Sequence, residues 1–211
     1  AANTTAADCR DMAGKIDFDD EARKLFASLG LNKLGEGIRA GGKYNALDPI
    51  FSAGEGKGTV YVGNETAAKS RNLLSGAGIT HVVNCTENIP NFHVREPGMQ
   101  YMRFPISYWS QHVRDSHESL LQFVQPVFDF VEQAIQSGGS VLVHCLAGAH
   151  RAGTTGCMLL MHYHQINAEA AIARAKKLRP AINPIGGLPM LLARYQAAMQ
   201  AGRGAKVKTV L

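Results

Sequence analysis

One short stretch limits the fold of this chain more than any other: the apolar run SVLVH at residues 140–144 and the loop CLAGAHRAGT that follows it. A continuous apolar run of this length, preceded by Gly138 and Gly139, is typical of a strand buried on both faces in the middle of a parallel sheet. The pattern after the loop is helical. The stretch therefore predicts a buried strand, a tight loop and a helix that begins near Arg151.

The loop brings together a thiol, backbone amides and an arginine. The first N–H groups of a helix have no partner within it and the helix dipole is positive there, so the loop favours an anion such as phosphate. The same surroundings favour the thiolate of Cys145 over its thiol. Arg151 can hold two phosphate oxygens with its planar fork, and Gly148 and Gly153 have no side chain to block a ligand. These residue types predict a nucleophilic sulfur beneath a bound phosphorus atom.

The rest of the chain alternates between strand and helix patterns. Besides residues 140–144, strands are expected at residues 59–63, 79–86 and 100–106. Helical periodicity covers residues 17–30, 65–78, 119–135, 154–164, 168–178 and 188–199. Alternation of this kind predicts an α/β domain.

The composition along the chain predicts three segments. Residues 1–45 form an N-terminal extension, with a short helix that begins with acidic residues and a glycine-rich linker after it. Residues 46–200 form the α/β domain that carries Cys145 and Arg151 and is therefore the expected catalytic domain. Residues 201–211 form a basic tail that contains Arg203, Lys206 and Lys208.

Composition also limits the function and the compartment. The net charge of +5 comes from scattered residues without interleaved aromatics, so no nucleic acid is expected as a partner. No apolar run approaches the roughly 20 residues that span a bilayer. The four cysteines lack metal-ligand spacing and favour a reducing compartment, the cytoplasm or the nucleus. Because the chain begins with Ala1, an organellar location is a further alternative.

HCLAGAHRAGT resembles the signature loop of the cysteine-based protein tyrosine phosphatase superfamily. The segments VYVGNETAA, LLSGAGITHVVNCTENIPN and RPAINPIGGLPMLLARYQ resemble its dual-specificity branch, and the resemblance covers about residues 58–197. It implies an α/β fold with a central, mostly parallel five-stranded sheet flanked by helices. It also implies a site without metal or cofactor, and hydrolysis of phosphotyrosine and phosphoserine or phosphothreonine in proteins through a phosphocysteine intermediate.

The resemblance assigns roles to residues of this chain. Cys145 attacks, Arg151 binds the phosphoryl group, and His144 orients the loop and helps to depress the pKa of the thiol. Cys85 ends the second predicted strand, where some relatives hold a cysteine that bonds to the nucleophile under oxidation. The phosphoryl oxygens are cradled by the amides of Leu146, Ala147, Gly148, Ala149, His150 and Arg151.

Two departures from the family pattern concern catalysis. Family members carry Ser or Thr after the arginine to help the sulfur leave, whereas this chain has Ala152; Thr154 or Thr155 could partly substitute. The aspartate that protonates the leaving oxygen is replaced at its usual place by Tyr108. Asp115 lies thirty residues before Cys145, within the family spacing, and is the expected acid; a helix cap is the alternative role.

Two other functions remain open at this point. One is a phosphatase that acts on a non-protein substrate, namely a phosphoglucan, a phosphoinositide or an RNA 5′ end. The other is a phosphatase-like binding or scaffold module with slow turnover, which Ala152 and the uncertain acid would explain. The oligomeric state cannot be read from the sequence.

Overall fold

The structure is a computed structural model that describes residues 16–32 and 44–208, with side chains described as far as Gly202. Most of the predicted glycine-rich linker, Cys9 and the last three residues of the predicted tail lie outside the described residues. Among the described residues, no helix combines the length and the apolar composition that crossing a membrane requires.

A five-stranded sheet forms the centre of the molecule, with strands in the order β1-β2-β5-β3-β4. The strands β2, β5, β3 and β4 run parallel, and β1 pairs antiparallel with β2 at one edge. The α/β fold with a mostly parallel sheet is thus confirmed. The strands are β1 Leu47–Ser52, β2 Thr59–Gly63, β3 Ile79–Asn84, β4 Gln100–Arg103 and β5 Ser140–His144.

The central strand is β5, and all of its residues are buried. Because side chains alternate along a strand, Val141 and Val143 join the apolar cluster on one face of the sheet, while Leu142 joins the cluster on the other. This two-sided burial explains why the sequence of the strand is apolar throughout.

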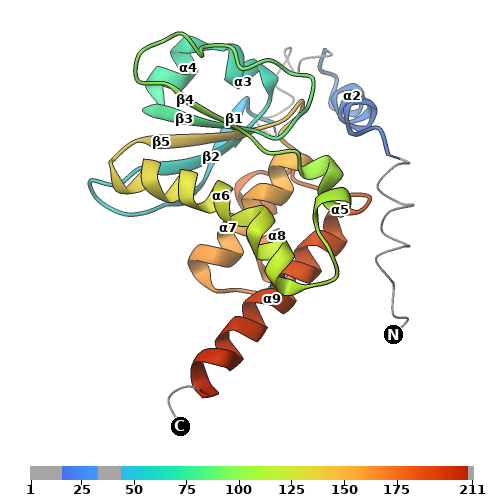
Figure 1. The fold of residues 1–211 in the computed structure, drawn as a ribbon. Coiled ribbons are helices and arrows are strands. Elements are labelled where there is room, and N and C mark those ends of the chain that lie inside the picture. Colours follow the sequence, from blue (N-terminus) through green and yellow to red (C-terminus); the bar gives the residue numbers. More distant parts are fainter. Residues whose placement is uncertain (1–15, 33–43, 209–211) are drawn as a thin grey trace.

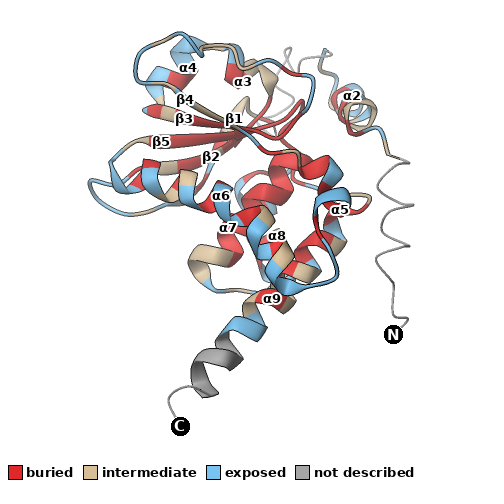
Figure 2. Cartoon of the chain, in the orientation of Figure 1, coloured by how far each residue is buried: buried red, intermediate tan, exposed pale blue. Residues whose placement is uncertain are grey.

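Helices cover both faces of the sheet, so the molecule has three layers (Figure 1). Short helices α3 and α4 lie on one face, and α6, α7, α8 and α9 lie on the other. Buried residues fill the sheet and the inward sides of the helices (Figure 2). The bounds are α2 Phe18–Ser28, α3 Glu65–Lys69, α4 Arg71–Gly76, α5 Trp109–His112, α6 His117–Gln136, α7 Arg151–His164, α8 Ala168–Leu178 and α9 Leu188–Lys208, with a 3-10 helix at Ile106–Tyr108.

Several elements differ from what the sequence patterns predict; α5 and the 3-10 helix, for example, have no predicted counterpart. Strand β1 has no predicted counterpart, because Pro49 obscures its pattern; an edge strand tolerates a proline that cannot donate a ladder hydrogen bond. The helix expected at residues 65–78 is divided at Ser70, whose extended backbone ends α3 and whose side chain caps α4. Helix α9 continues to Lys208, into the expected basic tail.

Helix α2 belongs to the predicted N-terminal extension, yet it packs on the catalytic domain. Asp17 caps its first turn by accepting hydrogen bonds from two backbone amides of that turn. Its buried residues Ala22 and Phe26 share an apolar cluster with Leu146, Ala147 and Ala149 of the loop after β5. The extension is therefore in contact with the predicted phosphate-binding loop.

Candidate active site

We call residues 145–151 the signature loop. The loop begins with Cys145 directly after β5 and ends with Arg151, the first residue of α7. Because β5 is the middle strand, the loop emerges from the centre of the carboxyl-terminal edge of the sheet, where ligands of open α/β sheets bind.

The carbonyl groups of residues 146–149 in the signature loop each accept a hydrogen bond from a residue outside the loop. The carbonyl of Leu146 accepts from the amide of Glu65 at 3.1 Å, and that of Ala149 from the amide of Asn183 at 3.0 Å. The carbonyl of Ala147 accepts from the hydroxyl of Tyr44 at 2.9 Å. In a trans peptide the C=O and the following N–H point in opposite directions, so the amides of residues 147–150 point away from these partners. That orientation builds an anion cradle.

Arg179 holds two of these carbonyls from a fully buried position. Its Nε donates to the carbonyl of Gly148 at 2.9 Å and its Nη2 to that of Ala147 at 3.0 Å. Its charge is balanced by Asp48, whose carboxylate accepts from Nη1 at 2.6 Å. No local sequence pattern singles out either residue, because Arg179 has the pattern of a basic residue at a helix end and Asp48 precedes Pro49 in a strand without a clear pattern.

Gly148 is needed for packing as much as for access to a ligand. Its φ of +62° lies in the left-handed region. An added Cβ would come within 2.4 Å of the carbonyl oxygen of Gly63. Any side chain at this position would push the signature loop away from the end of β2.

Arg151 is 3% exposed and surrounded by acidic groups. Its Nη2 forms an ion pair with the carboxylate of Asp19, and its Nη1 lies 3.5 Å from Glu87. Burial would lower the pKa of Arg151, but the charges of Cys145 and Asp19 outweigh burial and raise it. Its buried Nε has no hydrogen-bond partner within the part of the chain that the structure describes. The guanidinium thus stays charged and keeps one buried donor unused.

The two histidines of this region are both buried and neutral near pH 7. Burial lowers the pKa of His144 to about 3, so His144 cannot assist the thiolate as a positive charge. Burial also lowers the pKa of His150. The Nδ1–H of His150 donates to the carbonyl of Asn183 at 2.7 Å, because a carbonyl can only accept. His150 therefore holds the loop in place and does not project from it.

The residues after Arg151 show whether a nearby threonine replaces the hydroxyl that is absent at Ala152. Ala152 is fully buried in the core cluster that also contains Cys145. The hydroxyl of Thr154 donates to the carbonyl of His150 at 2.7 Å, and that of Thr155 lies 3.1 Å from the carbonyl of Arg151. Each hydroxyl has one proton, so neither threonine is placed to donate to the sulfur of Cys145 in this arrangement.

A cavity of about 330 Å³ opens beside Arg151. It is lined by Ile16, Asp17, Phe18, Asp19, Glu87, Asn88, Ser107, Tyr108 and Arg151. Cys145 is 2% exposed and is not among the lining residues. The structure therefore brings Arg151, Tyr108 and the start of α2 together at this cavity and leaves Cys145 beneath them.

The structure places Asp115 away from the cavity. Its side chain is 74% exposed, and its carboxylate lies 3.9 Å from Nη1 of Arg194. The carboxylates that do line the cavity are those of Asp17, Asp19 and Glu87. Glu87 directly follows the segment NCT at the end of β3. Its position at the carboxyl edge of the sheet is the sequence signal that could have identified it as a residue of the site.

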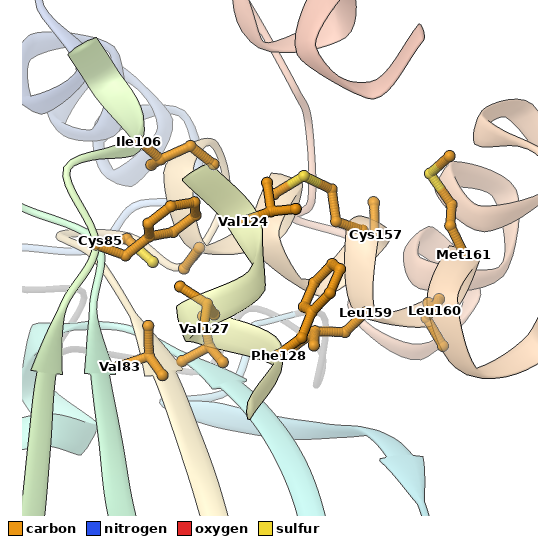
Figure 3. Packing of buried hydrophobic residues seen from close by; sticks show 14 of the residues in the cluster. Val83, Cys85, Ile106, Val124, Val127, Phe128, Cys157, Leu159, Leu160 and Met161 are labelled. Carbon is orange, nitrogen blue, oxygen red and sulfur yellow. The ribbon is translucent and has the colours of Figure 1, made fainter. Parts of the chain in front are cut away.

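Cys85 lies next to the signature loop but within the apolar core. It shares that core cluster with Val83, Ile106 and Val127 (Figure 3). Its sulfur lies 3.4 Å from the hydroxyl of Thr155. Burial raises the pKa of the Cys85 thiol, which keeps it protonated.

With its anion cradle at the end of the central strand and a thiol at the base of that cradle, the molecule has the architecture of a cysteine-based phosphatase. Comparison with known proteins agrees. A family model for the dual specificity phosphatase catalytic domain matches residues 60–198. Mouse dual specificity phosphatase 28 is 32% identical over 142 residues, which cover 67% of this chain and 82% of that protein. Human dual specificity protein phosphatase 21 is 30% identical over 147 residues, covering 70% of this chain and 73% of that protein.

Solved structures agree as well. A crystal structure of human DUSP28 has a TM-score of 0.59 and 25% identity, covering 74% of this chain and 96% of that one. A mouse dual specificity phosphatase in complex with zinc tungstate has a TM-score of 0.57 and 32% identity, covering 68% and 86%. The chain belongs to the dual-specificity phosphatase family and is a cysteine-dependent phosphatase.

Proposed function

We propose that the signature loop dephosphorylates phosphoproteins, with Cys145 as the nucleophile and Arg151 as the phosphate-binding residue. The outward bonding of the loop carbonyls carries this proposal, since it turns the amides of residues 147–150 away from those partners and leaves them available to an anion. The unused, buried Nε of Arg151 supplies a further donor for a phosphate oxygen. The tungstate in the mouse relative is an oxyanion of the same kind.

The reaction has two steps. The thiolate of Cys145 attacks phosphorus, the bond from phosphorus to the leaving oxygen breaks, and an acid protonates that oxygen. Water then attacks the phosphocysteine, the sulfur–phosphorus bond breaks, and the thiolate and inorganic phosphate are released. The amides and Arg151 hold the phosphoryl oxygens through both steps, as their charge increases.

Asp115 remains the proposed proton donor. Its loop joins α5 to α6, and the loop would have to move for the carboxylate to leave Arg194 and reach a substrate in the cavity. Glu87 is the carboxylate of the catalytic domain that already lines the cavity. Whether Asp115 or Glu87 is the acid is decided by comparing substrates with different leaving groups.

The charge around the cavity favours a phosphoprotein over a polyanionic substrate. The loop residues between Cys145 and Arg151 include no lysine, and Glu87 stands at the mouth. A phosphoinositide or an RNA 5′ end would bring further phosphates close to this carboxylate, which would repel them. We also place the protein in the cytoplasm or nucleus; the free thiols of Cys85, Cys145 and Cys157 support a reducing compartment.

The test is hydrolysis of a small aryl phosphate and of phosphopeptides by the whole chain, with and without orthovanadate. We expect vanadate-sensitive turnover that Cys145→Ser abolishes, because a serine hydroxyl is a much weaker nucleophile than a cysteine sulfur. Cys157→Ala is the matched control, since Cys157 lies in the core on α7 and should leave turnover within a few fold. Turnover in Cys145→Ser within tenfold of the wild type would refute the covalent mechanism.

A further inference from the structure

Helix α2 presents a carboxylate to the arginine that is proposed to bind phosphate. One oxygen of Asp19 pairs with Nη2 of Arg151, and the other accepts from Nδ2 of Asn88 at 3.0 Å. The ring of Phe18 lies 5.6 Å from the same guanidinium. A carboxylate and a phosphate bind a guanidinium through the same charge-assisted hydrogen bonds, so Asp19 uses a donor that a substrate needs.

The apolar side of α2 rests on the signature loop itself. Ala22 and Phe26 are each 1% exposed and cluster with loop residues that include Leu146. The ring of Phe26 also meets that of Tyr44 edge to face, with centroids 5.9 Å apart, and Tyr44 bonds the loop carbonyl of Ala147. These contacts hold Asp19 over Arg151 through a packed interface and not through one surface ion pair.

A bound phosphate and α2 compete for the same place. Nη2 carries two N–H groups, one on each of the two guanidinium edges that can hold a phosphate through paired bonds, and Asp19 accepts from one of them. A phosphate on the other edge would share Nη2 with the carboxylate of Asp19, and the two negative charges would repel each other. A phosphate must also touch the sulfur of Cys145, yet Cys145 is 2% exposed and does not reach the open cavity. A substrate therefore meets a repelling carboxylate at Arg151 and a buried nucleophile while α2 lies in this position.

We propose that α2 is a built-in pseudosubstrate, which occupies Arg151 with Asp19 and covers the signature loop, so that the enzyme is active only when α2 has left the loop. This inference rests on the proposed function of the loop. Because α2 and the loop belong to one chain, the inhibition is intramolecular and does not depend on protein concentration.

The experiment uses the whole chain and orthovanadate as a probe for the phosphate site. Asp19→Ala should bind vanadate at least about tenfold more tightly than the wild type by calorimetry, a change of about 1.4 kcal/mol. It should raise kcat/KM for an aryl phosphate by a similar factor. Phe26→Ala, which weakens the packing of α2, should shift both quantities in the same direction.

The matched control is Asp20→Ala. Asp20 is the next residue of α2, but its carboxylate pairs with the exposed Lys24 at 3.0 Å. It should leave vanadate affinity and turnover within about twofold of the wild type, because surface ion pairs contribute about 0–1 kcal/mol. Equal gains in Asp19→Ala and Asp20→Ala would overturn the proposal, since they would reflect net charge and not the contact with Arg151.

Hydrogen exchange separates a pseudosubstrate from a closing lid. Saturating vanadate should increase amide exchange across Phe18–Ser28 in the wild type, because the ligand displaces the helix; decreased exchange would overturn the proposal. If no variant hydrolyses the aryl phosphate but the vanadate affinities follow the expected order, the proposed function is refuted, whereas the proposal that α2 occupies the phosphate site is supported. If the wild type hydrolyses phosphate and Asp19→Ala matches it in affinity and turnover, the pseudosubstrate fails and the function stands.

Discussion

The backbone amide of Cys85 donates a 2.8 Å hydrogen bond to the carbonyl of His144, the residue that precedes the nucleophile. This bond extends the β3–β5 ladder, in which Asn84 lies opposite His144. Cys85 and Cys145 therefore follow paired positions of adjacent parallel strands, and their backbones are neighbours. Such proximity allows a reversible disulfide between them.

Mild peroxide should link Cys85 to Cys145. Peroxide oxidises the Cys145 thiolate to a sulfenic acid, and the Cys85 thiol then displaces water from it. The raised pKa of Cys85 should make this second step slow. Peptide mapping should find the bridge, and dithiothreitol should restore activity. In Cys85→Ala, mapping should instead find Cys145 as sulfinic acid; the same sulfinic product in the wild type, without a bridge, would reject the switch.

The acid can be identified by its dependence on the leaving group. Asp115→Asn should lower kcat/KM about a hundredfold or more with phosphopeptides, and much less with an aryl phosphate whose leaving group departs unprotonated. Glu87→Gln and Tyr108→Phe are the comparison variants, because both residues line the cavity. If Glu87→Gln shows this pattern and Asp115→Asn does not, Glu87 is the proton donor.

Ala152 predicts that the phosphocysteine accumulates. Without a hydroxyl after the arginine, and with Thr154 and Thr155 beside backbone carbonyls, the second step should be slower than the first. Rapid-quench kinetics should show a burst of released alcohol close to the enzyme concentration.

Ala152→Ser should then raise the steady rate and remove the burst. A hydrogen bond to a charged group is worth about 1.5–3 kcal/mol, on the order of tenfold to a hundredfold in rate. The added hydroxyl enters a fully buried position, so thermal unfolding should be measured alongside. The absence of a burst in the wild type, together with an unchanged rate in the variant, would show that Ala152 limits nothing.

His144 should make the fold sensitive to acid. Its pKa is about 3 in the folded protein, against an ordinary value of 6.5, so between these values the unfolded chain binds the additional proton. The contribution of neutral His144 to stability is fully present above pH 6.5 and decreases as the pH falls, by about 1.4 kcal/mol per pH unit. The free energy of unfolding, measured with urea across pH 4–7, should fall less steeply with decreasing pH in His144→Asn than in the control His112→Asn, whose histidine is exposed. Equal slopes would contradict the assignment.

The local sequence determined the parts of this protein that depend on neighbouring residues. The apolar run of β5, the glycines of the loop and the helical pattern of α7 are each complete within a few residues, and strand and helix periodicity encode them. The same stretch carries both Cys145 and Arg151. The family resemblance supplied the five-stranded sheet, because β1 with Pro49 shows no clear strand pattern of its own.

Only the tertiary structure decided what surrounds those residues. Asp19 meets Arg151 across 132 positions, and Asp48 meets Arg179 across 131. No local pattern encodes such pairs, because they arise when apolar faces, such as that of α2, are buried against distant elements. For the same reason Asp115 matches the family spacing along the chain and still lies beside Arg194: spacing determines which loop carries a side chain, whereas packing determines the direction in which it points.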